Sequence, residues 1–278
     1  MHLIDILICP DCKTGNLNVN DEKVVCENCD NKFFFDINQN QIVFKELYTP
    51  KKVEEDVFSL NENKKKNFSW RELNYLKIEQ FVKDFPVDSV CIDIGSGPMT
   101  NKNLLKKFNN IIYMDGAKFN SVNIVCDFEK VVPLKSNSAD AIILSNVLEH
   151  IFSPQTLLKE IYRVLKNNGK CLILVPYSIK LHQEPHDYFR YTKYALKKFL
   201  EDSNFINHKI EELGSITNVL DTILKHDRET PRNKNFLVNK LIFIFQWCIS
   251  KLFLLQCKLD STTINNQLPQ GYSVIVRK

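Results

Sequence analysis

The stretch from Val90 to Pro98 constrains the fold more than any other part of the sequence. It opens with Val-Cys-Ile-Asp-Ile, where three β-branched residues and a small cysteine suit a strand that is buried on both faces. Gly95 and Gly97 follow, and they permit a tight turn with close approach of a ligand to the backbone. Asp93 lies at the carboxyl end of the strand, where open α/β sheets bind ligands. The stretch predicts a ligand-binding α/β sheet.

Apolar runs that are typical of strands alternate with helical patterns after this stretch. Strands are expected at 110–115, 123–127, 139–145 and 170–176, and helices at 101–108 and 154–165. This alternation predicts an α/β fold with a doubly wound parallel sheet. Two further strands are expected at 207–213 and 271–277. The segment 214–270 between them is far too long for a turn and is expected to be a helical insertion before the last strand.

Length and charge set the outer limits of the interpretation. The chain has 278 residues, enough for one α/β domain and a smaller module. Its net charge of +4 is too small to argue for nucleic acid. The first residues lack the basic region of a signal peptide, so the nine cysteines are expected in a reducing, cytoplasmic compartment. We expect a zinc-ribbon domain at 1–46, a linker and lead-in helix at 47–85, and a catalytic domain at 86–278.

Four cysteines near the start form two CxxC knuckles. Cys9 and Cys12 make the first knuckle, and Cys26 and Cys29 make the second after thirteen intervening residues. Each knuckle puts two sulfur atoms on one turn, so the pair can close a tetrahedral site with all four ligands from protein. The pattern predicts a structural Zn²⁺ ion, and unconnected thiols or two disulfides are the alternatives.

The same segment resembles a known family of small proteins. Leu7, the Cys9–Cys12 knuckle and the run from Phe33 to Ile37 resemble the zinc ribbons that act as partner subunits of tRNA and protein methyltransferases. The resemblance covers about forty residues. It implies a role in folding or interaction and no catalysis by the ribbon.

Two acids that follow the next strands indicate the class of ligand. Asp115 lies about 20 residues past the glycine turn, where a carboxylate can accept both hydroxyls of a ribose. Asp127 ends the next strand and could accept the amine of an adenine, with Phe128 beside the ring. Each acid alone could equally be a turn residue. The GxGxxG fingerprint of dinucleotide sites is incomplete, because Thr100 replaces its third glycine, so an adenosine ligand without phosphates fits better.

The ordered set of motifs resembles the class I S-adenosylmethionine-dependent methyltransferases, most closely the type-11 family, over roughly residues 85–213. The resemblance implies a Rossmann-like sheet of seven strands and S-adenosylmethionine as the cofactor. It places the methionine part of the cofactor over the glycines and the segment from Asn146 to His150 near the methyl group. The cofactor-binding residues that it implies are Asp93, Gly95, Gly97, Asp115, Asp127, Phe128 and Asn146.

A long polar and aromatic loop, residues 177–192, is expected over the methyl group. Methyl transfer to a hydroxyl needs a base, and His186 paired with Asp187 is one candidate while His150 is its competitor. Transfer to an already acidic oxygen needs mainly alignment. Loop stabilisation is the alternative role for His186. The run 186–192 resembles a stretch of the type-11 family near the acceptor, which implies substrate contacts by Tyr188, Arg190 and Tyr191.

The expected function is methyl transfer from S-adenosylmethionine to an oxygen of a small-molecule, glycan or lipid-linked sugar acceptor. A tRNA or other RNA methyltransferase is the alternative that the ribbon suggests. The sequence lacks a dense basic stripe, so nucleic acid is not expected as a partner. A non-catalytic cofactor-binding scaffold is the third hypothesis, and the intact set of cofactor residues argues against it.

The segment 236–256 within the insertion is unusually apolar. It is about long enough to span a bilayer, but Lys240, Gln246 and Lys251 interrupt it. An amphipathic helix with a broad apolar face is therefore predicted. The helix could pack on the catalytic domain, bind a partner, or make peripheral contact with a membrane surface.

Overall fold

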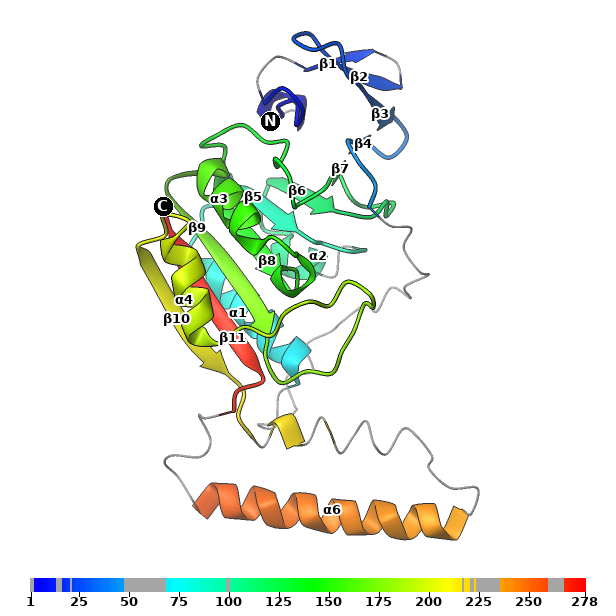
Figure 1. Cartoon of the computed structure of the whole chain (residues 1–278), viewed down its shortest axis with the longest axis vertical. Helices are drawn as coiled ribbons and strands as arrows, with labels where there is room; N and C mark the ends of the chain where they lie inside the picture. Colours follow the sequence, from blue (N-terminus) through cyan, green and yellow to red (C-terminus); the bar gives the residue numbers. More distant parts are fainter. Residues whose placement is uncertain are drawn as a thin grey trace.

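The computed structural model of the chain describes residues 3–13, 17–20, 22–47, 69–98, 101–216, 218–220, 223, 236–259 and 268–278. The catalytic part is a sheet of seven strands (Figure 1). They are β5 (Val90–Ile94), β6 (Asn110–Asp115), β7 (Ile124–Val125), β8 (Ala139–Ser145), β9 (Leu165–Pro176), β10 (Asn207–Leu213) and β11 (Gly271–Arg277). Their spatial order is β7-β6-β5-β8-β9-β11-β10, which confirms the predicted Rossmann-like sheet.

Strand β5 lies at the centre of the catalytic sheet. It pairs in parallel with β6 on one side and with β8 on the other, and β8 pairs in parallel with β9. The last strand, β11, is antiparallel to both β9 and β10. After β5 the chain builds β6 and β7 outward on one side and then returns to build β8 and β9 on the other. The carboxyl end of β5 is thus a topological switch point, where open α/β sheets bind ligands.

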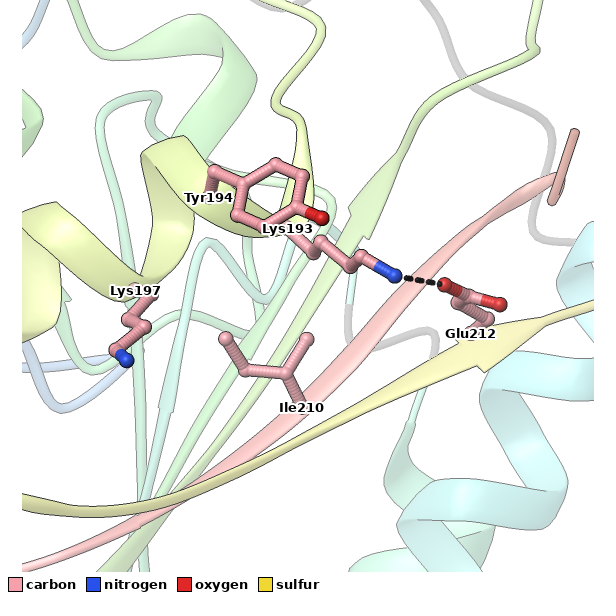
Figure 2. Close-up of a pocket in the computed structure, with 5 residues that line it drawn as sticks. All are labelled: Lys193, Tyr194, Lys197, Ile210 and Glu212. Atoms are coloured by element: carbon pink, nitrogen blue, oxygen red, sulfur yellow. Dashed lines mark hydrogen bonds and ion pairs between the residues drawn. The ribbon is translucent and has the colours of Figure 1, made fainter. Parts of the chain in front are cut away.

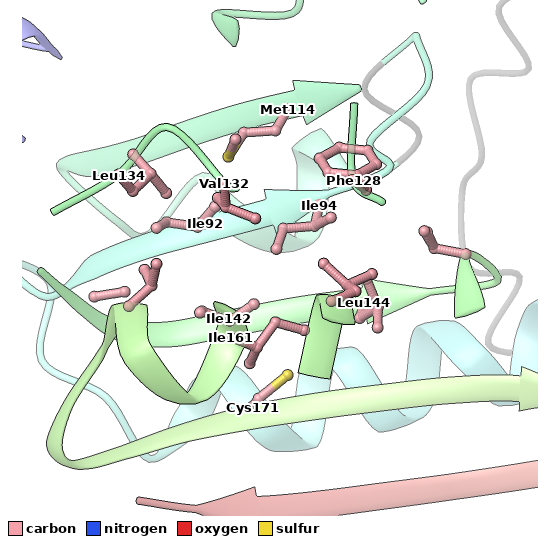
Figure 3. Packing of buried hydrophobic residues seen from close by; sticks show 14 of the residues in the cluster. Ile92, Ile94, Met114, Phe128, Val132, Leu134, Ile142, Leu144, Ile161 and Cys171 are labelled. Carbon is pink, nitrogen blue, oxygen red and sulfur yellow. The ribbon is translucent and has the colours of Figure 1, made fainter. Parts of the chain in front are cut away.

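Side chains of the central strands alternate between two buried layers. Ile92 and Ile142 face a core that includes residues of α3 (Pro154–Val164) and α4 (Lys193–Glu201), and Figure 3 shows part of this core. Cys91 and Ile143 face the opposite core, which α1 (Trp70–Lys83) and α2 (Lys102–Leu105) help to form. A strand that is covered on both faces must be apolar at nearly every position. This explains the run that opens at Val90.

The helices begin where their capping residues predict. Ser69 caps α1, and its side chain forms a reciprocal capping box with Glu72. Thr192 caps α4 by accepting from the backbone N–H of Ala195. The helix predicted at 101–108 is much shorter than expected. Asn101 makes no capping hydrogen bond there, and its side-chain amide instead donates to Asp93.

The amino-terminal ribbon continues the catalytic sheet. Its strands are β1 (Leu17–Asn20), β2 (Lys23–Cys26), β3 (Lys32–Asp36) and β4 (Gln41–Val43), and they follow the short 3-10 helix η1 (Leu3–Ile6). Strand β4 pairs in parallel with β7, so Ile42 lies beside Ile124. The side-chain amide of Gln41, which is fully buried, donates to the carbonyls of Phe119 and Val122 at 2.7 Å each. Leu7 bridges to Leu134, and both side chains are buried.

The joined sheet has a consequence for the domain organisation. The ribbon shares one hydrophobic core with the catalytic strands, since buried side chains such as Val24 and Phe33 belong to the same cluster as Ile92. We predicted a separate module at 1–46, and the structure shows a module whose last strand extends the neighbouring sheet. The linker at 48–68, with its run of three lysines, lies outside the described residues.

The predicted helix in the insertion is present as α6 (Phe236–Leu259), and it stands apart from the sheet in Figure 1. None of its described side chains is buried, and Leu237, Leu241 and Leu252 are each 67% exposed. The described side chains therefore do not support packing on the catalytic domain. Among the helices in the described ranges, none has the length and hydropathy needed to cross a membrane. Contact of α6 with a membrane surface or a partner stays a prediction.

Candidate active site

The glycine turn after β5 has one crowded side and one open side. Gly95 and Gly97 both have positive φ angles, of +71° and +54°. A Cβ atom on Gly95 would lie 2.2 Å from Cγ2 of Val147, whereas a Cβ atom on Gly97 would meet no atom of the described residues within 4 Å. The turn therefore needs glycine at residue 95 for packing, and it leaves free space over residue 97. A cofactor that lies against the turn requires such space.

Asp93 is buried at the end of β5, with a 1% exposed side chain. The side-chain amide of Asn101 donates to its carboxyl group at 3.2 Å. Burial raises the pKa of Asp93 to about 7, the Asn101 hydrogen bond lowers it, and the nearby Asp115 carboxylate raises it. A cationic amine at this point would supply the opposite charge that the buried carboxylate needs. The site therefore fits the amino group of S-adenosylmethionine.

Asp115 joins the end of β6 to the glycine turn. One carboxylate oxygen, Oδ2, accepts from the backbone N–H of Gly97 at 2.8 Å, and Oδ1 accepts from the N–H of Ala117 at 2.9 Å. These bonds hold the carboxylate beside the open side of the turn. Its position fits the predicted contact with the ribose.

Asp127 follows β7 and forms an ion pair with a residue of the ribbon segment. Its Oδ2 forms an ion pair with Nζ of Lys45 at 2.9 Å, and its Oδ1 accepts from the N–H of Glu129. Lys45 lies just after β4 and is distant from Asp127 in the chain. No local sequence pattern therefore predicts this contact. Phe128 is buried in the main core, near Ile94 in Figure 3.

Asn146 follows β8 with a positive φ of +55°. Its side-chain oxygen accepts from the indole N–H of Trp70 at 2.7 Å. Trp70 is the first residue of α1, so the lead-in helix contacts a residue that was predicted to bind the cofactor. The prediction from sequence did not identify Trp70 as a partner of Asn146, because the two residues are distant in the chain.

The polar loop after β9 folds onto the short 3-10 helix η2 (Leu148–His150). The backbone carbonyl of Glu149 accepts from the N–H groups of Tyr188 and Phe189, at 2.9 and 3.2 Å. The hydroxyl of Tyr191 donates to the carbonyl of Leu148 at 2.9 Å. Tyr191 is buried, and Tyr188 is 41% exposed. The loop expected to face the acceptor is therefore fixed to the segment expected near the methyl group.

Three acid–base side chains meet where this loop contacts η2. Glu149 is fully buried, and its Oε1 lies 3.7 Å from Nε2 of His150 and 3.7 Å from Nε2 of His182. The Glu149 carboxylate raises the pKa of His182, while burial of the imidazole lowers it. Glu149 and His182 were not among the predicted site residues. Their separation in the chain gives no spacing signal, although both lie in segments that the sequence placed near the methyl group.

The predicted pair of His186 and Asp187 has a different arrangement. Both carboxylate oxygens of Asp187 bind the Arg190 guanidinium, at 2.6 and 2.8 Å, and this contact lowers the pKa of Asp187 to about 2. The imidazole of His186 contacts the hydroxyl of Tyr188, and its backbone carbonyl accepts from Nδ1 of His150. Arg190, predicted to bind substrate, is engaged by Asp187. The catalytic and substrate roles of these residues stay predictions.

The four cysteines of the ribbon meet at one point. Sγ of Cys9 lies 3.6 Å from Sγ of Cys29, and Sγ of Cys12 lies 3.6 Å from that of Cys26. All four sulfur atoms lie within 4.8 Å of one another. Sulfur atoms about 2.3 Å from a tetrahedral Zn²⁺ ion are about 3.8 Å apart. The cluster therefore fits a small zinc ribbon.

A surface pocket lies between α4 and β10, at the edge of the sheet opposite β7 (Figure 2). Nζ of Lys193 and Oε1 of Glu212 form an ion pair at 3.1 Å across it. None of the predicted site residues lines this pocket. The residues that line it are Lys193, Tyr194, Lys197, Ile210 and Glu212.

Comparisons with known proteins agree with the geometry. Residues 79–173 match the family model described as a methyltransferase domain. A structure of an S-adenosylmethionine-dependent methyltransferase from Archaeoglobus fulgidus is similar, with 20% identity and a TM-score of 0.50; the match covers 75% of this chain and 94% of that one. A Haemonchus contortus phosphoethanolamine N-methyltransferase 2 is similar at 19% identity and a TM-score of 0.47, over 76% of this chain and 54% of that one. No protein with a curated description matches the chain significantly.

The strand order, the glycine turn and the buried acids define the class I fold of S-adenosylmethionine-dependent methyltransferases. The match of residues 79–173 to the methyltransferase domain covers β5, β6, β7, β8 and most of β9. The chain therefore contains a methyltransferase domain with the class I fold, and the geometry of its site fits S-adenosylmethionine as the cofactor.

The two glycines provide a matched pair of substitutions. We expect Gly95→Ala to destabilise the fold by about 1–3 kcal/mol, because its methyl group would overlap Val147. Gly97→Ala carries only the backbone cost, about 1–2 kcal/mol, but its methyl group enters the open space expected for the cofactor. Thermal denaturation and calorimetry with S-adenosylmethionine measure both effects. Normal cofactor binding by Gly97→Ala would show that the cofactor does not lie there.

The raised pKa of Asp93 predicts a pH-dependent stability. The folded state binds a proton on Asp93 between pH about 4 and 7, while the unfolded state does not. Stability therefore falls as pH rises through this window, by at most about 1.4 kcal/mol per pH unit. The slope should be smaller in Asp93→Asn and unchanged in the exposed control Asp202→Asn. Urea denaturation at several pH values measures the slope, and equal slopes in all three proteins would contradict the prediction.

Proposed function

We propose that the protein transfers a methyl group to an oxygen atom of a small-molecule, glycan or lipid-linked sugar acceptor. The convergence of Glu149, His150 and His182 just after β8 carries the proposal. Two imidazoles and a carboxylate suit the removal of a proton from a hydroxyl. The cofactor supplies an electrophilic methyl group on a positively charged sulfur. The residues of this chain would position the acceptor and hold its proton.

The arrangement of the loop supports the same interpretation. Tyr191, Tyr188 and Phe189 fix the loop on η2, so His182, which the loop carries, lies beside Glu149 and His150. Exclusion of water beside a sulfonium methyl favours an acceptor that is aligned by the protein. The methyl carbon gains a bond to the acceptor oxygen and loses its bond to sulfur, and the acceptor proton leaves with a base.

Asp115→Ala tests cofactor use. We expect the affinity for S-adenosylmethionine to fall about 10- to 100-fold, because one or two hydrogen bonds to a charged acceptor are lost. The exposed acid Asp202 provides the control variant Asp202→Ala, which should bind as the wild type does. Calorimetry on full-length proteins of equal thermal stability gives the affinities. Equal affinities in all three proteins would contradict the predicted role of Asp115.

Methyl transfer tests the acceptor class. The full-length protein and S-adenosylmethionine with a labelled methyl group are incubated with free sugars, a lipid-linked sugar and bulk tRNA in separate reactions. We expect label on an oxygen of a sugar or another small molecule. Label in tRNA, or on a nitrogen atom, would overturn the proposed acceptor class and favour the alternative function.

We further propose that the four ribbon cysteines bind one structural Zn²⁺ ion. Their sulfur spacing and the absence of a position for a non-protein ligand support a closed site. Because the ribbon strands extend the catalytic sheet, loss of the ion should destabilise the entire chain.

The zinc proposal predicts, in metal analysis, one zinc ion per chain that depends on the ribbon cysteines. Cys26→Ser should lose the metal and lower the thermal midpoint, because a structural zinc site contributes folding energy. Cys171→Ser, a buried cysteine of β9 outside the ribbon, is the control and should retain the metal. Absence of zinc from the wild type, or its retention by Cys26→Ser with unchanged stability, would overturn the proposal.

A further inference from the structure

We propose that Glu149, His150 and His182 form a second metal site, which binds one divalent transition-metal ion. We call these three residues the Glu149 cluster. Their ligand atoms all lie within 4.8 Å of one another. The proposed role of the ion in holding the acceptor rests on the proposed function above, whereas the binding of the ion does not.

The hydrogen bonds of the two imidazoles direct their free lone pairs to the same point. Nδ1 of His150 lies 2.6 Å from the backbone carbonyl of His186, and Nδ1 of His182 lies 3.2 Å from the carbonyl of Lys180. A carbonyl oxygen can only accept, so each Nδ1 must carry the hydrogen. Each neutral ring then has a lone pair on Nε2, and both Nε2 atoms face the Glu149 carboxylate. Two nitrogen lone pairs and a carboxylate repel one another unless a proton or a metal ion lies among them.

The burial of Glu149 also favours a bound cation. Its side chain is fully buried, and within the described part of the chain neither carboxylate oxygen has a hydrogen-bond partner. The two Nε2 atoms lie 3.7 Å from Oε1, which is beyond hydrogen-bond distance. A buried carboxylate without a hydrogen bond is costly, and a bound cation removes that cost. Ligands about 2.1 Å from one ion lie roughly 3.0–3.4 Å apart, so the two Glu149–histidine pairs at 3.7 Å would need shifts of only a few tenths of an ångström.

Contacts with Asp187 and Arg190 fix the position of His182. The backbone N–H of His182 donates to Oδ2 of Asp187 at 2.9 Å, and the same oxygen lies 3.4 Å from Nδ1 of His182. Arg190 binds both oxygens of Asp187 and so fixes that carboxylate. Metal-binding histidines in proteins commonly donate their other nitrogen to a carbonyl or carboxylate in this way. Asp187 and Arg190 therefore act as positioning residues for His182.

The three ligands indicate which metal ions would bind and which coordination positions would stay open. Two imidazole nitrogens with one carboxylate suit Mn²⁺, Fe²⁺, Co²⁺ or Zn²⁺ better than Mg²⁺ or Ca²⁺, which prefer oxygen ligands. Three protein ligands leave coordination positions open. The side chain of His182 is 30% exposed, so the open positions face solvent on that side. An acceptor hydroxyl could bind there.

An ion at this point would promote the proposed transfer as a Lewis acid. With both imidazoles bound to the ion, the ion would replace them in activating the acceptor: it would lower the pKa of the bound hydroxyl, whose proton would leave to solvent. The oxygen lone pair then forms the new bond to the methyl carbon. The electron pair of the broken carbon–sulfur bond stays on sulfur, which becomes a neutral thioether.

Manganese binding tests the site in the full-length protein. Mn²⁺ is the first probe because thiolate ligands select other metals, so the ribbon cysteines should not compete for it. Electron paramagnetic resonance of free Mn²⁺ gives the stoichiometry and affinity in the absence of cofactor and acceptor. Co²⁺ and Zn²⁺ are titrated by calorimetry into protein whose ribbon is already loaded with zinc. We expect at least one of the three ions to bind with one equivalent per chain.

Three variants assign the site to the Glu149 cluster. His182→Ala and Glu149→Gln should weaken binding at least about 10-fold, because each removes a ligand. His208→Ala is the matched control: its imidazole also bonds a carbonyl, that of Phe205, but lies on β10. It should bind as the wild type does. The ion should raise the thermal midpoint of the wild type and leave that of Glu149→Gln unchanged.

Two results would overturn the proposal. One is the absence of any bound Mn²⁺, Co²⁺ or Zn²⁺ beyond the ribbon equivalent. The other is binding by His182→Ala and Glu149→Gln with wild-type affinity. Calorimetry with S-adenosylmethionine is run on the same proteins. A wild type that binds the cofactor but none of the three ions would count against the second metal site alone. A wild type that binds the metal but not the cofactor would count against the proposed function alone.

Discussion

The parallel pairing of β5 with β6 on one side and β8 on the other is the constraint on which the rest of the structure depends. It buries β5 on both faces, so all its side chains except that of Asp93 are apolar. Burial of each large aliphatic side chain stabilises the fold by about 1.5–3 kcal/mol. It also places the strand's last acid, Asp93, at the point where the chain reverses its direction of winding. The position and the charge of the cofactor site both follow from this pairing.

The ribbon depends on the same sheet from the other side. β4 adds to β7 by backbone hydrogen bonds, and the side chain of Gln41 anchors the junction through hydrogen bonds to two backbone carbonyls. Lys45, two residues beyond β4, then reaches Asp127. The ribbon thereby contributes a charge directly to an acid that is predicted to hold adenine. The edge of the catalytic sheet is covered as a result, which removes an exposed edge strand.

The acceptor side of the site depends on contacts between distant segments. Glu149 comes from η2 after β8, and His182 comes from the loop after β9. Backbone hydrogen bonds from Tyr188 and Phe189 to Glu149 hold the two segments together. The loop is thus part of the site's architecture, and Asp187 and Arg190 stabilise it from within. In this arrangement His186 and Asp187, which were predicted as a catalytic pair, contact Tyr188 and Arg190.

The sequence by itself determined the elements and the class of ligand. Strands such as 110–115 and 139–145, the caps Ser69 and Thr192, and the acids Asp93 and Asp115 were predictable, because period, capping and strand-end position are local properties. Tertiary structure decided that the ribbon extends the sheet and that Trp70 contacts Asn146. It also brought His182 to Glu149 and directed Asp187 to Arg190. Most of these pairings join residues that are distant in the chain, and Asp187 had both His186 and Arg190 as nearby candidate partners. Only the packing of the complete fold determines which contacts form.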